Sequence, residues 1–146
     1  IFGQIFQDTD NSKINRKFFK LVAYKKISKK LMDDIIFASK VAKHLKSNAV
    51  VLSKNKQTLG IGCGQTNRVD ALRSALVRYR ENFGINEFVC ASDGFFPFTD
   101  SLKILLKHNC KCLGQPSGSI NDEKIIKYAS EKNLPIYFIK NRLFKH

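Results

Sequence analysis

Three phenylalanines and two aspartates are concentrated in residues 92–100, which read Ser-Asp-Gly-Phe-Phe-Pro-Phe-Thr-Asp. Apolar rings beside fixed carboxylates can hold a flat ligand that has polar edges. The same rings could instead fill the core of the domain. This segment alone supports the ligand-binding wall and the core plug about equally.

Two other loops contain groups that could bind an anion. Residues 60–65, Gly-Ile-Gly-Cys-Gly-Gln, lead to a predicted helix that carries Arg68. Glycines let a backbone approach a ligand closely, but this pattern is neither a P-loop nor a dinucleotide fingerprint, so a tight strand-to-helix turn explains it more simply. Residues 116–121, Pro-Ser-Gly-Ser-Ile-Asn, could bind a carboxylate or phosphate, or could only cap a helix at Asn121.

Arg142, close to the last residue, could hold a phosphate through two hydrogen bonds, although a solvated charge would look the same. The three histidines are far apart and have no recognisable nucleophile partner. The spacing His108-x-Cys110-x-Cys112 matches no common zinc motif, and the zinc-deaminase signature is absent. The sequence therefore assigns no catalytic residue and no metal site.

Helices and short apolar runs alternate along most of the chain. Caps and apolar spacing predict helices over 28–45, 69–83, 101–108 and 121–132, and strands over 49–53, 57–61, 87–91, 111–115 and 135–139. Residues 1–27 show no regular pattern. This alternation favours an α/β domain with several parallel strands, in which loops 92–100 and 116–120 follow the carboxyl ends of strands, where ligands gather.

The chain has 146 residues and a formal net charge of +14, with 26 lysines and arginines against 12 aspartates and glutamates. Such a charge could attract nucleic acid, an anionic membrane or phosphorylated small molecules. The lysines are spread along the whole chain, so we interpret them mainly as surface composition. Four cysteines without a disulfide pattern favour a reducing, cytoplasmic setting. No apolar run is long enough to span a membrane. The first residues read as the interior of a longer protein.

Several ordered segments resemble the C-terminal part of the bifunctional purine biosynthesis family, the transformylase–cyclohydrolase that makes inosine monophosphate. The order and spacing of these segments match through nearly the whole chain. They comprise residues 33–38, 40–44 and 46–49, residues 60–65 with 68–70, residues 91–100, residues 115–120, and residues 142–144 before the final His146.

The resemblance implies formyl transfer from 10-formyltetrahydrofolate to the 5-amino group of 5-aminoimidazole-4-carboxamide ribonucleotide, in a cytoplasmic homodimer that also has cyclohydrolase activity. It implies a three-layer α/β/α, cytidine-deaminase-like fold with a mixed, mostly parallel sheet. Residues 28–146 would form the C-terminal lobe of the transformylase domain, and residues 1–27 an irregular entry from a preceding lobe. The residues implied to hold the ribonucleotide are Asn48, Arg68, Phe95 and Arg142, and those implied to contact the folate co-substrate are Val69, Asp100, Ser119 and Ile120.

The family's catalytic lysine–histidine pair lies upstream of the matching segment, and Lys43-His44 aligns with a different position. We therefore expect this chain to supply part of a site without turnover. A basic nucleic-acid-binding module and a non-catalytic remnant are the two alternatives.

Overall fold

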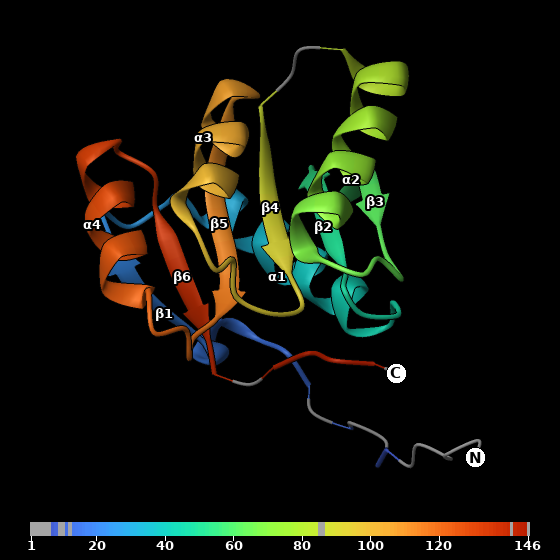
Figure 1. The fold of residues 1–146 in the computed structure, drawn as a ribbon, viewed down its shortest axis with the longest axis horizontal. Helices are drawn as coiled ribbons and strands as arrows, with labels where there is room; N and C mark the ends of the chain where they lie inside the picture. The colour runs from blue at the N-terminus through green and yellow to red at the C-terminus, as the bar shows by residue number, and fades with distance from the viewer. Residues whose placement is uncertain (1–6, 9–10, 12, 85–86, 141, 146) are drawn as a thin grey trace.

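A mixed six-stranded sheet with helices on both faces forms the protein (Figure 1). The computed structural model describes residues 7–8, 11, 13–84, 87–140 and 142–145. The elements are the 3-10 helix η1 (Arg16–Phe18), strands β1 (Phe19–Ala23), β2 (Val50–Lys54), β3 (Gln57–Gly62), β4 (Phe88–Ser92), β5 (Cys110–Pro116) and β6 (Ile136–Ile139), and helices α1 (Lys29–Lys43), α2 (Arg68–Phe83), α3 (Thr99–Lys107) and α4 (Asp122–Glu131).

The strands lie in the order β1-β6-β5-β4-β2-β3. The central strands β4, β5 and β6 are parallel, whereas β1 runs antiparallel to β6 and the hairpin β2–β3 antiparallel to β4. Helix α1 covers one face, where Ile35 packs against Val89 and Cys112. Helices α2, α3 and α4 cover the other face through a larger apolar cluster. The predicted α/β/α class is therefore confirmed.

The helices begin and end within two residues of the predicted bounds, and local hydrogen bonds or backbone angles mark three of these ends. The Ser28 hydroxyl accepts a hydrogen bond from the Leu31 amide at 3.2 Å and caps α1. The Asn67 side chain accepts from the Asp70 amide at 2.8 Å and caps α2. Gly84, with a φ of 66°, ends α2 in a backbone conformation that glycine adopts without strain.

Strand β1 was missed, and the prediction that residues 1–27 are irregular is wrong for its second half. Residues 16–18 form a 3-10 helix and residues 19–23 form an edge strand. The strand is short and its burial does not alternate cleanly. It pairs with β6, from Phe19 opposite Ile139 to Ala23 opposite Ile136. Since the partner lies near the other end of the chain, no local pattern indicated this strand.

Gly60 and Gly62 let α2 lie directly on β3. A Cβ atom at Gly60 would collide with the backbone carbonyl of Ala75, and one at Gly62 with that of Ala71. The sequence analysis considered a ligand contact and a tight turn for these two glycines. Neither holds, because both glycines face the backbone of α2. Only Gly64, with a φ of 64°, lies in the turn itself. The close packing of α2 on β3 therefore fixes the position of Arg68, the first residue of α2.

No helix in the described ranges is long and apolar enough to cross a membrane. Within the same ranges, no group of three or more His, Cys, Asp or Glu side chains could hold a metal ion.

The four cysteines are free thiols, of which Cys63 is exposed and Cys90, Cys110 and Cys112 are buried. Burial raises the pKa of the Cys110 thiol to about 12 from its ordinary 9.0, and it raises the pKa of Cys90 and Cys112 well above 9.0. Because the thiolate is the reactive species, we expect Ellman's reagent at pH 8 to titrate one thiol in the native protein and four in denaturant.

The same shifts set a pH dependence. Above pH about 9 the three buried thiols ionise in the unfolded chain before they do in the folded one. The free energy of unfolding should therefore decrease as pH rises, by ~1.4 kcal/mol per pH unit for each thiol. Cys63→Ser should abolish the fast Ellman reaction and leave this slope unchanged. Rapid reaction of a second native thiol would contradict the assignment.

Candidate functional site

One edge of the sheet collects the loops that the sequence singled out. The parallel strands β4 and β5 end there and lead into loops 92–100 and 116–121, while β6 ends there and leads into the C-terminal tail, residues 142–145. Val50, the first residue of β2, pairs with Ser92 at the end of β4 and with Gly62 at the end of β3. Asn48, which precedes β2, and Arg68, the first residue of α2, therefore lie at this same edge.

Arg68 is the centre of this cluster, and its side chain is only 11% exposed. Its Nη2 donates to Asn48 Oδ1 at 2.7 Å and to Asp93 Oδ1 at 3.1 Å. Its Nε donates to the same Asp93 oxygen at 3.3 Å, and its Nη1 donates to the Phe95 carbonyl at 3.1 Å. These bonds use the single N–H of Nε and both N–H groups of Nη2. Nη1 has two N–H groups and uses one of them, so one is left for another partner.

Asp93 is a residue of this cluster that the sequence analysis did not assign to a site. Its side chain is fully buried, and its Oδ2 has no hydrogen-bond partner among the described residues. Its amide donates to the Ala49 carbonyl and its carbonyl accepts from the Leu143 amide, both at 3.1 Å. The available signal was its position as the first charged residue after a wholly buried strand.

The C-terminal tail completes the cluster. The guanidinium of Arg142 lies 5.5 Å from the centroid of the Phe95 ring and 5.6 Å from that of Phe144, and the Arg68 guanidinium lies 5.9 Å from the Phe144 centroid. These distances are within the range of cation–π attraction. Arg142 is exposed, and no described residue accepts a hydrogen bond from its guanidinium. Phe144 was matched as part of a motif but not assigned a role.

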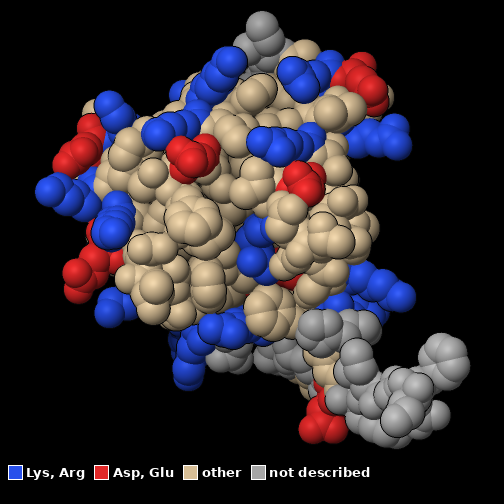
Figure 2. All heavy atoms as spheres, in the orientation of Figure 1, with Lys and Arg blue, Asp and Glu red and all other residues tan. Residues whose placement is uncertain are grey.

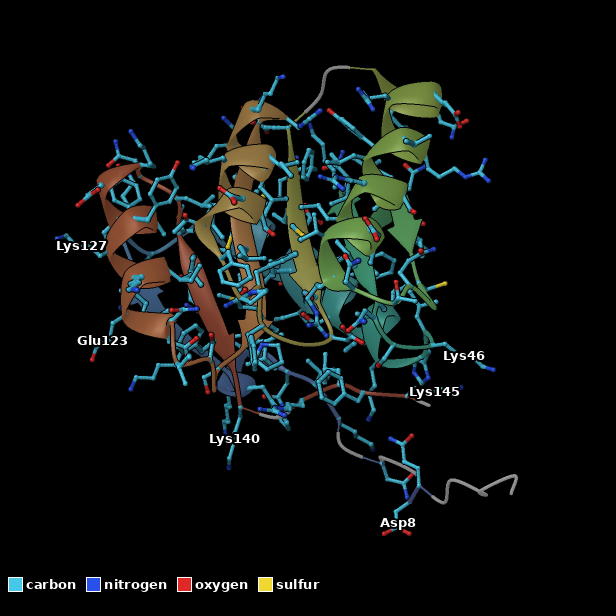
Figure 3. The ribbon with its side chains drawn as sticks, viewed as in Figure 1. Asp8, Lys46, Glu123, Lys127, Lys140 and Lys145 are labelled. Carbon is cyan, nitrogen blue, oxygen red and sulfur yellow. The ribbon has the colours of Figure 1, made fainter. Side chains whose placement is uncertain are left out.

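Backbone contacts hold the tail in place. The Ser47 amide donates to the Lys145 carbonyl at 2.9 Å, and the Lys145 amide donates to the Ser47 hydroxyl at 3.3 Å. Figure 3 shows Lys46 and Lys145 side by side at this edge. Leu143 is buried and packs with Ile14 and Ile139. The tail is thus anchored at Leu143, between Arg142 and Phe144, and at Lys145.

The aromatic loop divides its three rings between the two roles considered. Phe96 is fully buried and belongs to the large core cluster, so its ring fills the core of the domain. Phe95 is half-buried beside Arg142, and Phe98 is 62% exposed. The Gln115 side chain accepts from the Phe96 amide at 3.1 Å, which fixes the loop against β5.

The residues implied for folate are less tightly grouped. Asp100 is 76% exposed and forms an ion pair with Lys103 at 2.9 Å, and Ile120 is 100% exposed. A groove of about 260 Å³ runs between the first turns of α3 and α4. Its lining includes Asp100, whereas Val69, half-buried on α2, is not among the lining residues.

In loop 116–121, Asn121 does not cap α4 through its side chain, although one of the two sequence interpretations predicted such a cap. The Asn121 side chain makes no capping bond to α4 and instead donates to the Pro97 carbonyl at 3.0 Å, which ties loop 116–121 to loop 92–100. The Ser119 hydroxyl accepts from the Asn121 amide at 3.1 Å. Gly118 approaches the tail, because a Cβ atom there would lie 3.2 Å from Arg142 Nη2. Of the eight implied residues, Asn48, Arg68, Phe95 and Arg142 are joined by contacts. Of the other four, Asp100 lines the groove, Ser119 and Ile120 precede its lining residue Asn121 in sequence, and Val69 is on α2.

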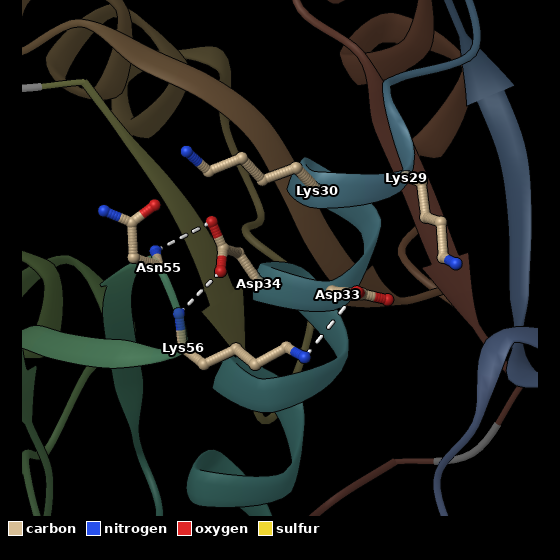
Figure 4. Close-up of a pocket in the computed structure, with 6 residues that line it drawn as sticks. All are labelled: Lys29, Lys30, Asp33, Asp34, Asn55 and Lys56. Atoms are coloured by element: carbon tan, nitrogen blue, oxygen red, sulfur yellow. Dashed lines mark hydrogen bonds and ion pairs between the residues drawn. The ribbon is translucent and has the colours of Figure 1, made fainter.

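A larger cavity of about 520 Å³ lies at the opposite end of β2, around the β2–β3 turn (Figure 4). Asp34 is buried there, and its two carboxylate oxygens accept from the amides of Asn55 and Lys56 at 3.0 and 2.7 Å. Lys56 forms an ion pair with Asp33 at 3.7 Å. The buried carboxylate therefore stabilises a turn, and none of the implied site residues lines this cavity.

Lysines and arginines do not gather into one stripe on the face shown in Figure 2. They are dispersed over this face, around its rim and near its centre, with acidic side chains between them. This distribution agrees with the interpretation of the +14 charge as surface composition.

The fold and the cluster define a mixed-sheet α/β/α domain with an arginine–aromatic site at one sheet edge. The profile of the AICARFT/IMPCHase bienzyme family matches residues 1–78, which is more than half of the chain. The chain therefore belongs to the AICARFT/IMPCHase bienzyme family.

Relatives named bifunctional purine biosynthesis protein PurH match throughout the chain. The chain is 43% identical to that of Buchnera aphidicola subsp. Baizongia pistaciae over 148 residues, which cover all of this chain and 28% of the relative. It is 42% identical to the protein of Wigglesworthia glossinidia brevipalpis and 43% identical to that of Persephonella marina, with 99% of this chain covered in each case. The chain thus spans about 28% of the length of these relatives.

Proposed function

We propose that the chain is the C-terminal portion of a transformylase region, and that it binds 5-aminoimidazole-4-carboxamide ribonucleotide and 10-formyltetrahydrofolate for formyl transfer in purine synthesis. The parent protein would also carry IMP cyclohydrolase activity. The observation that carries the proposal is the direct contact network among Asn48, Arg68, Phe95 and Arg142, four residues implied for one ligand and drawn from distant parts of the chain.

The two arginines suit different parts of a ribonucleotide. Arg142 is exposed and held over two rings, so its donors can meet a phosphate in the paired geometry that guanidinium groups favour. Arg68 has one N–H to offer, which suits a single acceptor atom rather than a phosphate clamp. The half-buried Phe95 ring provides an apolar surface for the imidazole.

The groove between α3 and α4 suits a pterin. It combines the carboxylate of Asp100, which can accept hydrogen bonds from pterin N–H groups, with the exposed ring of Phe98. Ile120, which directly precedes the groove residue Asn121, is fully exposed. It would be covered by the folate or by the second subunit of a homodimer. No nucleic acid, membrane or metal is part of this proposal.

The chain would bind and orient the two substrates. Holding the weakly nucleophilic amine close to the formyl carbon lowers the entropic barrier of transfer. A proton acceptor is then needed for the amine, together with hydrogen-bond donors for the oxyanion that forms on the formyl carbon. We assign the acceptor to the family's lysine–histidine pair outside this chain, so the 146-residue chain alone should not transfer formyl groups.

Ribonucleotide binding tests the proposal. The ribonucleotide should raise the thermal midpoint of the full-length protein, and Arg142→Ala should reduce its affinity at least tenfold because the phosphate loses its charged partner. Arg80→Ala, an exposed arginine in the last turn of α2, should bind like the wild type.

Three results would contradict the proposal. The first is the absence of any ribonucleotide stabilisation, and the second is formyl transfer by the 146-residue chain alone. The third is a salt-dependent RNA affinity far stronger than the affinity for the ribonucleotide, which would favour the nucleic-acid-binding alternative.

A further inference from the structure

We propose that Asp93 is a positioning residue for the ribonucleotide site, and that it acts by holding the guanidinium of Arg68 in one orientation. The identity of the ligand rests on the proposed function, whereas the coupling between Asp93 and Arg68 does not.

The geometry gives Asp93 control over the plane of the guanidinium. A single oxygen, Oδ1, accepts from both Nε and Nη2, at 3.3 and 3.1 Å. Two donors that share one acceptor leave the arginine side chain little freedom to rotate. Asn48 and the Phe95 carbonyl fix its other edge, so the remaining N–H of Nη1 has a set direction.

Several contacts hold the backbone of Asp93 in position. Its amide is tied to Ala49 before β2, and its carbonyl to Leu143 in the tail. The next residue, Gly94, leaves room for the arginine, because a Cβ atom there would lie 2.7 Å from Arg68 Cζ and 2.8 Å from Phe144 Cε1. Asp93 thus connects β2, the aromatic loop, the tail and Arg68 at one buried point.

The buried charge has a second consequence. Asp93 is fully buried beside Arg68, so the pair is close to neutral as a unit, and most of the positive charge offered to a ligand comes from Arg142. Asp93 would therefore affect recognition of the part of the ligand that meets Arg68. It would have little effect on the phosphate.

Binding measurements on the full-length protein test this role. Asp93→Asn should weaken the ribonucleotide and its unphosphorylated riboside by the same factor, at least tenfold, whereas Arg142→Ala should weaken only the ribonucleotide. In an Arg68→Gln background, Asp93→Asn should cause no further loss. A purely structural role would give the same loss in both backgrounds. Such a result, or wild-type affinity in the Asp93→Asn protein, would overturn the proposal.

Crystal structures of the ligand-free protein separate this inference from the proposed function. Arg68 should keep one rotamer in the wild type and lose it in Asp93→Asn. Glu81→Gln, which removes the exposed partner of Arg78, is the matched control and should leave Arg68 and the affinities unchanged. Absence of ribonucleotide binding by the wild type would refute the proposed function, while an unchanged Arg68 rotamer in Asp93→Asn would refute the positioning role on its own.

Discussion

Arg68→Ala is expected to lower the free energy of unfolding by about 3–5 kcal/mol, because it leaves the fully buried Asp93 carboxylate without its charged partner. The Asp93 Oδ2 has no hydrogen-bond partner among the described residues, so no described contact of this oxygen offsets the loss of Arg68. Urea denaturation followed by circular dichroism measures the change.

Arg78→Ala is the matched control for this effect. Arg78 is on the same helix and pairs with Glu81 at 3.7 Å, with side chains 72% and 57% exposed. Exposed pairs contribute only ~0–1 kcal/mol, so this variant should remain close to the wild type. Adding Asp93→Asn to Arg68→Ala should restore part of the loss, because the buried charge is removed. Equal costs for Arg68→Ala and Arg78→Ala would show that the buried pair does not stabilise the fold.

Gly62→Ala is expected to cost more than about 3 kcal/mol, since the added methyl group has no space between β3 and the backbone of α2. The obstacle is the carbonyl of Ala71, which cannot move without shifting the helix. Displacement of α2 would also move Arg68, so ribonucleotide binding should be lost together with stability. Urea midpoints and binding assays on the same preparations measure both effects.

Gly84→Ala makes the same chemical change where there is open space. Beyond its chain neighbours, no atom of a described residue lies within 4 Å of a Cβ built at Gly84. The cost comes from its backbone conformation, φ 66° and ψ −146°, and is about 1–3 kcal/mol for an alanine. This variant should keep its ribonucleotide affinity. If Gly62→Ala proved no more destabilising than Gly84→Ala, the close packing of α2 on β3 would be wrong.

The elements that could be predicted from the sequence are those with local signals. Ser28, Asn67 and Gly84 mark helix ends through bonds or backbone angles within a few residues. Strand β1 could not be predicted because its stability comes from pairing with β6 at the far end of the chain. For the glycines at 60 and 62 the sequence suggested a turn or a ligand contact, and neither was right, because a sequence does not say that a helix will lie against them.

The site was predictable to a similar degree. The resemblance brought Asn48, Arg68, Phe95 and Arg142 into one group, and the topology explains how they meet at one sheet edge. Asp93 and Phe144 were not assigned, because their importance depends on where the Arg68 guanidinium points. That direction is set by tertiary packing of α2, which no spacing rule captures.

The pairing of β1 with β6 has a consequence for the order in which the protein folds. Strands β4, β5 and β6 are linked by single helices and can associate through contacts between neighbouring segments. Strand β1 must find a partner from the other end of the described chain, and closing so long a loop slows folding. We therefore expect β1 to join the sheet late during refolding, and its amides to be the first strand amides to exchange with solvent deuterium in the native protein.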